Sequence, residues 1–250
     1  MEGNEACSMR NILIVNDDGY YSYGIKLLYE KLKKYGNCYV FAPAEAKSGA
    51  SHSFDVKGPF VVENLEENIY KAYASPADCV RLALDILDIK FDLVFSGIND
   101  GLNLGDDIMY SGTCHAALEG IIGGIPSVAI STDKDSFEIC ENEIDQILKL
   151  VFDKELYSNQ YVLNINFPTR DFKKSKGIKL TKQGIKRFKT SFYKNDLDGK
   201  YYVMGEKITY DSNKDTDSCL SLEGYITITL ISTHSNDLKN YEKIEKKLNH

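Results

Sequence analysis

The first 165 residues of the chain alternate short apolar runs with amphipathic segments. The runs span residues 12–16, 38–42, 92–96, 126–131 and 161–166. The first run contains four aliphatic residues in succession, which is typical of a strand buried on both faces of a sheet. Between the runs, apolar residues recur at helical spacing, as Ile25, Leu28 and Leu32 do. This alternation predicts an α/β fold with a mostly parallel sheet and helices on both of its faces.

A different pattern begins near residue 168. Four segments rich in Tyr, Phe, Thr and Ile, with polar residues between them, predict β-hairpins over 177–181, 185–193, 200–210 and 224–231. Gly199 supplies a turn signal between the middle two segments. We therefore expect a core over residues 9–170 and a C-terminal β-hairpin extension over residues 171–250 that serves oligomerisation. The alternative is that these strands form a mixed edge of the same sheet.

The two ends of the chain carry separate signals. One apolar stripe runs through the Lys-rich stretch 236–250, which predicts a short amphipathic helix at the end of the extension. Residues 1–8 are polar and precede a second methionine, Met9. We expect them to be an added leader or an alternative start that lies outside the fold.

Composition restricts the classes of protein to which the chain can belong. Hydrophobic residues make up 43% and charged residues 27% of its 250 residues, and no apolar run reaches the roughly 18 residues that span a bilayer. Six cysteines without a C-x-x-C pair and four histidines without ligand spacing argue against a zinc site and a disulfide framework. The net charge of −7 argues against binding of a nucleic-acid polymer. We expect a cytoplasmic protein with reduced thiols and no membrane contact.

Two adjacent carboxylates, Asp17 and Asp18, follow the first predicted strand directly, and Gly19 comes next. Ligand sites in open α/β sheets lie at the carboxyl ends of strands. Two like charges at such an edge repel each other unless a positive group lies between them, and Mg²⁺ or Mn²⁺ prefers carboxylate oxygens. The pair therefore favours a divalent-metal site. The alternative is a polar turn that ends the strand.

Two further loops follow predicted strands at the same edge. Residues 42–51 contain small and hydroxyl-bearing side chains that suit an oxygen ligand or an anion contact. Residues 96–107 combine three glycines at spacings of four with asparagines, whose amide oxygens can complete a Mg²⁺ shell without adding charge. This spacing matches neither a dinucleotide-binding nor a P-loop motif. A solvated connection and a simple glycine-rich turn are the respective alternatives.

A hydroxyl-rich turn, residues 110–113, stands directly before a predicted helix over residues 114–124. Backbone N–H groups at a helix N-terminus together with two hydroxyls can bind an anion, although the same residues could simply cap the helix. Carboxylates, hydroxyls, an asparagine and a helix N-terminus at one sheet edge together predict a metal-assisted phosphate site. No nucleophile with an adjacent base is evident, so attack by metal-activated water is the simplest chemistry.

The same segments resemble the stationary-phase survival protein SurE family. The resemblance is carried by residues 15–19, 42–43, 48–51, 75–79, 96–107, 110–113, 164–168, 216–217 and 224–229. It runs through nearly the whole chain from Met9, in the order and spacing of the family.

The resemblance implies a divalent-metal-dependent phosphatase that acts on nucleoside 5′-monophosphates, often on 3′-monophosphates and sometimes on polyphosphate. The metal ligands it implies, for one Mg²⁺, Mn²⁺ or similar ion per subunit, are Asp17, Asp18, Ser48 and Asn99. The implied phosphate contacts are Asn16, Gly49, Ser111, Gly112 and Thr113, and the implied catalytic residues are Asp17, Asp18 and Asn16. The family fold is a Rossmann-like sheet with a C-terminal hairpin that is exchanged between subunits of homodimers or homotetramers.

The chain departs from the family pattern at two places of note. Residues 20–24 replace a His-Ala-Pro-Gly-like stretch, and His115 replaces a glycine in the helix after the hydroxyl-rich turn. His115 could touch the phosphate or be a buried structural residue. Two other functions compete with the metal-dependent one. A haloacid-dehalogenase-type phosphatase needs a D-x-D pair, but Gly19 holds the position two after Asp17. A non-catalytic nucleotide-binding module would use the same sheet edge.

Overall fold

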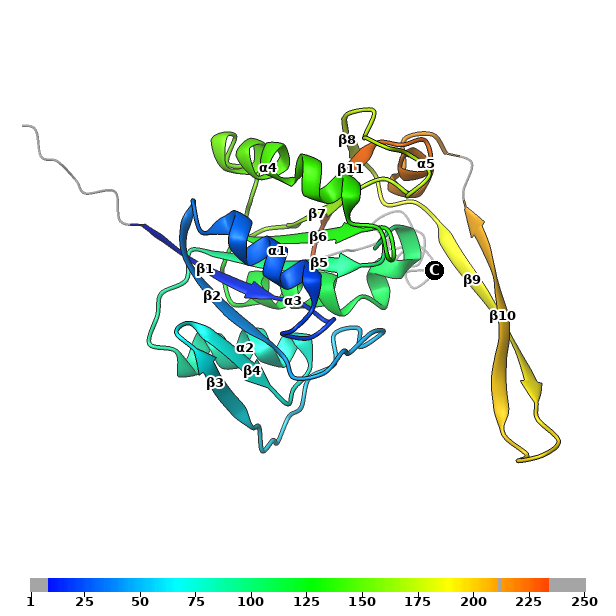
Figure 1. Ribbon diagram of the computed structural model, residues 1–250, viewed down its shortest axis with the longest axis horizontal. Coiled ribbons are helices and arrows are strands. Elements are labelled where there is room, and N and C mark those ends of the chain that lie inside the picture. Colours follow the sequence, from blue (N-terminus) through cyan, green and yellow to red (C-terminus); the bar gives the residue numbers. More distant parts are fainter. Residues whose placement is uncertain (1–8, 211–212, 234–250) are drawn as a thin grey trace, which may run out of the picture.

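The computed structural model describes residues 9–210 and 213–233 of the chain, and a nine-stranded sheet forms its centre (Figure 1). The strands of this sheet lie in the order β3-β4-β2-β1-β5-β6-β7-β11-β8. Their bounds are β1 (Arg10–Val15), β2 (Gly36–Pro43), β3 (Val62–Glu66), β4 (Ile69–Ala72), β5 (Leu93–Asp100), β6 (Ser127–Thr132), β7 (Val162–Asn166), β8 (Ile178–Thr181) and β11 (Ile226–Ile231). Strands β4, β2, β1, β5, β6 and β7 are mutually parallel, which confirms the predicted fold class.

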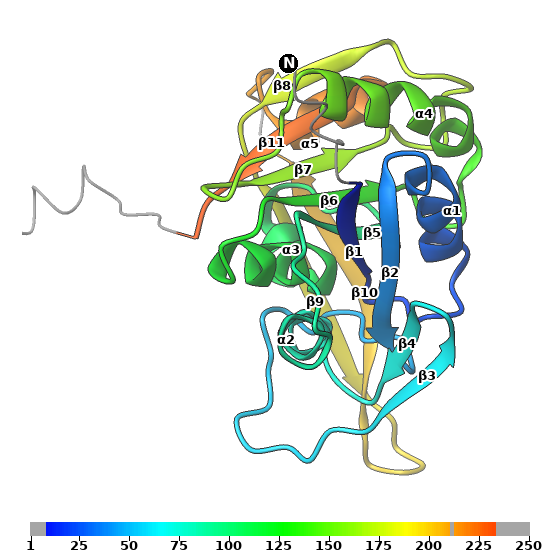
Figure 2. The same ribbon diagram turned by 90° about the vertical axis from the view of Figure 1, so that its left-hand side faces the viewer.

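Helices cover both faces of the sheet (Figure 2). They are α1 (Tyr23–Leu32), α2 (Pro76–Ile86), α3 (Gly112–Ile122), α4 (Glu138–Asp153) and α5 (Asp217–Leu222), with a 3₁₀ turn, η1 (Gly105–Met109). Alternate residues of β1 enter two separate cores: Ile12 and Ile14 pack with α1 and α4, whereas Leu13 and Val15 pack with α2. Burial on both faces explains why the first apolar run has no polar alternation. In the described part of the chain, no helix is long and apolar enough to cross a bilayer.

The hairpin expected after the core is present as β9 (Lys186–Lys194) and β10 (Tyr201–Tyr210), which pair antiparallel in a sheet of their own. Figure 1 shows this hairpin extending away from the body of the molecule. The hairpins predicted over 177–181 and 224–231 are wrong, because those segments become β8 and β11 of the main sheet and form the mixed edge that was the alternative. Strand β11 is buried along most of its length between β7 and β8, as an inner strand must be.

The predicted division at residue 170 stays a prediction, although two strands beyond it complete the central sheet. The helix predicted over 236–250 and the leader predicted over 1–8 lie outside the described residues. Local helix signals are confirmed at α2, where Pro76 is the first residue and the Ser75 hydroxyl accepts a hydrogen bond from the Asp78 N–H.

Helix α1 lies against β5 at a contact that only glycine permits. A Cβ atom on Gly24 would lie 1.9 Å from the carbonyl oxygen of Ile98. We expect Gly24→Ala to lower the free energy of unfolding by about 1–3 kcal/mol, because helix and strand would have to separate. Urea unfolding measures the effect. Lys26→Ala, at an exposed position of the same helix, is the matched control, and equal stability of the two variants would contradict the prediction.

Candidate metal and phosphate site

A cleft of about 740 Å³ opens at the carboxyl edge of the parallel strands. Its wall contains all four predicted metal ligands and two of the predicted phosphate contacts: Asp17, Asp18, Ser48, Asn99, Gly49 and Ser111. The carboxylates follow β1, the 48–49 loop follows β2, and Asn99 lies near the end of β5. These strands are neighbours in the sheet, so parallel pairing brings the three segments together.

Asp17 is the most enclosed polar residue of the cleft, with 4% of its surface exposed. Its Oδ1 accepts a hydrogen bond of 2.6 Å from the hydroxyl of Thr113. Burial raises the pKa of Asp17 to about 6, the Thr113 hydrogen bond opposes this rise, and the negative charge of Asp18 adds to it. Gly112 must be a glycine here, because a Cβ atom on it would lie 2.8 Å from the Asp17 Cβ. Gly112 and Thr113 therefore support Asp17 from behind the cleft.

Asp18 and Asn99 are oriented by backbone groups of Asp100, the last residue of β5, and of Gly101, which follows it. The Oδ2 of Asp18 accepts a hydrogen bond of 3.0 Å from the N–H of Asp100. Burial is the main cause of a raised pKa at Asp18, and the nearby charge of Asp100 contributes. The side-chain amide of Asn99 donates to the Gly101 carbonyl over 2.6 Å, so its Oδ1 is the atom that could bind a metal.

Asn16 is fully buried beside this pair of carboxylates. Its amide nitrogen donates to the Gly19 carbonyl and to the Ser22 hydroxyl at 3.0 and 2.8 Å. Its Oδ1 has no hydrogen-bond partner among the described residues. Asn16, predicted as a catalytic residue and a phosphate contact, does not line the cleft, and its amide nitrogen bonds to the turn that follows the carboxylates.

The donors at this edge fit a hard divalent ion. Within the residues that the structure describes, no three side chains of His, Cys, Asp or Glu gather as a metal site. The predicted set is of another kind, because it combines two carboxylates with a hydroxyl and an amide oxygen, which are ligands that Mg²⁺ and Mn²⁺ accept. Burial raises the pKa values of the two adjacent carboxylates, and a cation bound between them would stabilise their charged forms.

Ser111 caps α3, which begins at Gly112, two residues before the predicted start of this helix at Cys114. The Ser111 hydroxyl accepts a hydrogen bond of 3.0 Å from the Cys114 N–H. Loop residue Gly49 faces the same cleft with φ of +73°, and no atom lies within 4 Å of where a Cβ would be. The open space at Gly49 and the N-terminus of α3 together form a surface on which an anion can bind.

His115 lies on α3 outside the cleft, and its ring contacts the residue that caps this helix and His52. Its Nδ1 is 2.8 Å from the Ser111 carbonyl oxygen, and its ring centroid is 5.0 Å from that of His52. Burial lowers the pKa of His115. The structure thus matches the reading of His115 as a buried structural residue, which holds the turn that carries Ser111.

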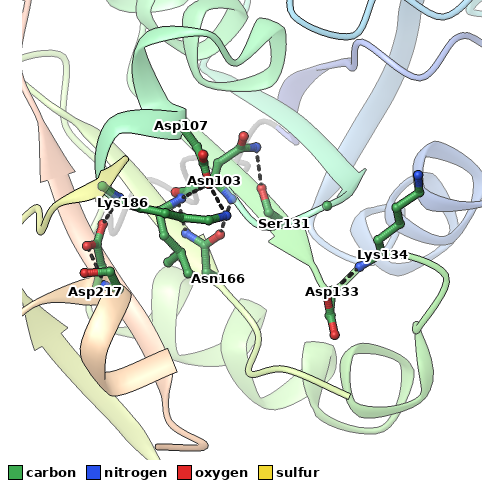
Figure 3. Close-up of polar contacts among 12 residues, drawn as sticks. Asn103, Asp107, Ser131, Asp133, Lys134, Asn166, Lys186 and Asp217 are labelled. Carbon is green, nitrogen blue, oxygen red and sulfur yellow. Dashed lines mark hydrogen bonds and ion pairs between the residues drawn. The ribbon is translucent and has the colours of Figure 1, made fainter. Parts of the chain in front are cut away.

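Several residues that the sequence analysis did not single out also form this cleft (Figure 3). They include Asn103, Asp107, Lys134 and Lys186. The backbone N–H of Asn103 donates to the Asn166 Oδ1 over 2.8 Å, and its carbonyl accepts from the side chains of Asn164 and Asn166 at 3.0 and 3.1 Å. The sequence signal for this network is the pair Asn164 and Asn166, which alternate with apolar residues in the buried strand β7.

Comparison with known proteins agrees with these observations. The model of the family "Survival protein SurE" matches residues 12–190. The chain belongs to the SurE family. A protein of Aquifex aeolicus named 5′-nucleotidase SurE is 38% identical over 243 residues, which cover 94% of this chain and 95% of that protein. A protein of the same name from Campylobacter jejuni is 39% identical over 256 residues, which cover 95% of this chain and 96% of the relative.

A solved structure of a relative has the same fold as this chain. A crystal structure of the SurE protein from Aquifex aeolicus matches this chain with a TM-score of 0.80 and 35% identity, covering 96% of this chain and 100% of that chain. The match to the SurE model includes most of β1 and all of β2, β5 and α3. It also includes the segments after β1 and β2 that contain predicted ligands, and it reaches into β9 of the hairpin. The resemblance found in the sequence is thereby confirmed.

The raised pKa of Asp17 predicts how the stability of this SurE-family protein depends on pH when no metal is bound. A folded-state pKa above the unfolded value means that stability falls as pH rises from 3.8 to about 6. Asp17→Asn should therefore make the metal-free protein more stable at neutral pH, by at most about 3 kcal/mol. Urea unfolding in chelator measures this. Asp88→Asn, an exposed carboxylate, is the control, and a less stable Asp17→Asn protein would contradict the prediction.

Proposed function

We propose that this chain is a divalent-metal-dependent 5′-nucleotidase, which hydrolyses nucleoside 5′-monophosphates with metal-activated water. Hydrolysis of 3′-monophosphates and of polyphosphate is proposed as a further activity of the same site. The observation that carries the proposal is the convergence of Asp17, Asp18, Ser48 and Asn99 on one cleft. The name 5′-nucleotidase SurE, which relatives with 38% and 39% identity bear, supports the reaction class.

Each part of the cleft has a place in this mechanism. Asp17, Asp18, Ser48 and Asn99 would hold the ion, which supplies charge neutralisation and an activated water when it is bound. Gly49 and the N-terminus of α3 at Ser111 bind and orient the phosphate opposite these ligands. Thr113 and Asn16 act from behind, since Thr113 fixes one oxygen of Asp17 and Asn16 fixes the turn at Gly19.

The cleft also offers an apolar wall that a nucleoside can contact. Leu102, Tyr110, Ile208 and Tyr210 line it together with the polar groups. Tyr110, Ile208 and Tyr210 are partly exposed large side chains, and aromatic rings can stack on a nucleobase. This wall favours a nucleotide over a phosphate ester without an apolar group as the substrate.

The rival phosphatase chemistry uses an aspartate as nucleophile. Asp17 is poorly placed for that role, because it is almost completely buried and its Oδ1 is bound by Thr113. Gly19 stands where the second aspartate of a D-x-D pair would be. A covalent aspartyl-phosphate trapped during turnover would nevertheless decide for that chemistry. A non-catalytic module would bind a nucleotide and release it unchanged.

Hydrolysis of a nucleoside 5′-monophosphate should cease in EDTA and return on addition of Mg²⁺, Mn²⁺ or Co²⁺. The reason is that five carboxylates line the cleft, so a dianionic phosphate needs a bound cation there. Asp18→Asn should lower kcat by orders of magnitude, while Asp88→Asn should not. Full turnover by the metal-free protein, measured as phosphate release, would contradict the proposed function.

We also propose that the chain forms homodimers or homotetramers through its hairpin. Both faces of the hairpin carry exposed apolar or aromatic side chains: Phe192 and Val203 are directly opposed on one face and are 62% and 58% exposed, while the rings of Tyr193 and Tyr202 stack on the other. A two-stranded hairpin alone is marginally stable in water, and exposed apolar patches of this kind mark interfaces. A partner subunit would cover them.

The double variant Phe192→Glu/Val203→Lys tests this interface. Opposite charges at directly opposed positions preserve the hairpin while removing its apolar surface. We expect the variant to be monomeric by light scattering at micromolar concentration, where the parent chain is a dimer or tetramer. Val56→Glu, at an exposed loop position distant in sequence from the hairpin, is the control. A monomeric parent chain would contradict the proposal.

A further inference from the structure

The cleft is rich in negative charge and poor in positive charge. Its wall carries five carboxylates, Asp17, Asp18, Asp100, Asp107 and Asp133. The cations among the described residues that line it are Lys134 and Lys186. Lys134 lies exposed on the loop after β6, whereas the Lys186 side chain is only 13% exposed. Lys186 is thus the cation that is partly withdrawn from water, where its attraction for an anion is strongest.

Lys186 is the first residue of β9, and its backbone is held tightly against the loop after β5. The buried carboxylate of Asp217 accepts hydrogen bonds from the Gly105 N–H at 3.1 Å and from the Gly184 N–H at 2.8 Å. A Cβ atom on Gly105 would lie 2.7 Å from the Lys186 nitrogen, so loop and hairpin base are in close backbone contact. The point from which the lysine side chain starts is therefore fixed.

The side chain of Lys186 reaches across to Asp107 (Figure 3). Its Nζ is 2.5 Å from the Asp107 Oδ2, and both side chains are nearly enclosed, at 13% and 11% exposed. Burial raises the pKa of Asp107, and Lys186 opposes that rise. Enclosed ion pairs give little net stability, because desolvation offsets their attraction. A contribution to stability therefore does not by itself explain why this ion pair lies in the wall of the cleft.

We propose that Lys186 binds the phosphate group of the substrate and that Asp107 holds the ammonium in place when no phosphate is bound. This inference rests on the proposed function, whose phosphate it serves. An ammonium carries three donors, so it can bind a phosphate oxygen while remaining close to Asp107. The hairpin base then contributes directly to the site, in addition to any contact between subunits.

Charge variants of the pair distinguish this role from a purely structural one. In the presence of Mn²⁺, Lys186→Gln should weaken binding of inorganic phosphate about tenfold or more, because a charge-assisted hydrogen bond is lost. Asp107→Asn should bind phosphate as tightly as the parent chain or more tightly, since the charge of Asp107 no longer competes with the phosphate for the ammonium. A structural ion pair predicts that both variants lose affinity together. Lys186→Arg should retain affinity, and Mn²⁺ affinity should be the same in all variants.

Calorimetry with inorganic phosphate is the measurement, and thermal unfolding controls for the fold. Lys186→Gln leaves Asp107 charged and enclosed, so it could fail to fold. The double variant Lys186→Gln/Asp107→Asn avoids this, and it should bind phosphate at least tenfold more weakly than Asp107→Asn alone. Equal affinity of these two folded proteins would overturn the proposal, as would a parent chain that binds no phosphate. The assay needs no turnover, so missing nucleotidase activity with intact phosphate binding would refute the proposed function and leave Lys186 in its role.

Discussion

The organising constraint of this molecule is the placement of two adjacent carboxylates at the end of a strand that is buried on both faces. The buried strand β1 delivers Asp17 into an environment that disfavours its charge, as the raised pKa shows. Neighbouring groups partly offset the cost of burying these charges. Thr113 donates to Asp17, the Asp100 N–H donates to Asp18, and Gly112 lets α3 approach closely. A cation that binds here gains from a site already arranged for it.

The part of the site that could be predicted from the sequence is the part that follows from strand order. Asp17, Ser48 and Asn99 come after apolar runs, and the carboxyl ends of parallel strands meet at one edge. The same reasoning predicted the hairpin of β9 and β10 correctly but misjudged two other strands of the C-terminal third. Strands β8 and β11 were expected to be hairpins, because their alternation with polar residues is typical of a half-exposed sheet. Buried hydroxyls such as Thr227 and Thr229 made an inner strand look amphipathic.

The remaining cleft residues could not be predicted because tertiary contacts alone place them. Lys186 reaches the cleft only through the attachment of the hairpin base to the loop at Gly105, which Asp217 secures from a third segment. Asn103 has its role because its backbone bonds to side chains of β7, some 60 residues further along the chain. Thr113 carries a hydroxyl typical of phosphate turns, yet the structure directs it to Asp17. The sequence pattern thus predicts which segments reach the cleft, whereas tertiary packing decides which of their atoms face it.

The position of Asp217 has a consequence for how the protein is made. This one carboxylate joins backbone groups at Gly105, Gly184 and Ser218. Strand β11, which follows it, inserts between β7 and β8. During synthesis the ribosome releases Asp17, Asp18 and Asn99 long before Asp217, so a growing chain exposes its acidic strand ends while the far wall of the cleft is still missing. The wall of the cleft that carries Lys186 is therefore held in place only after the segments that follow β1, β2 and β5 have been made.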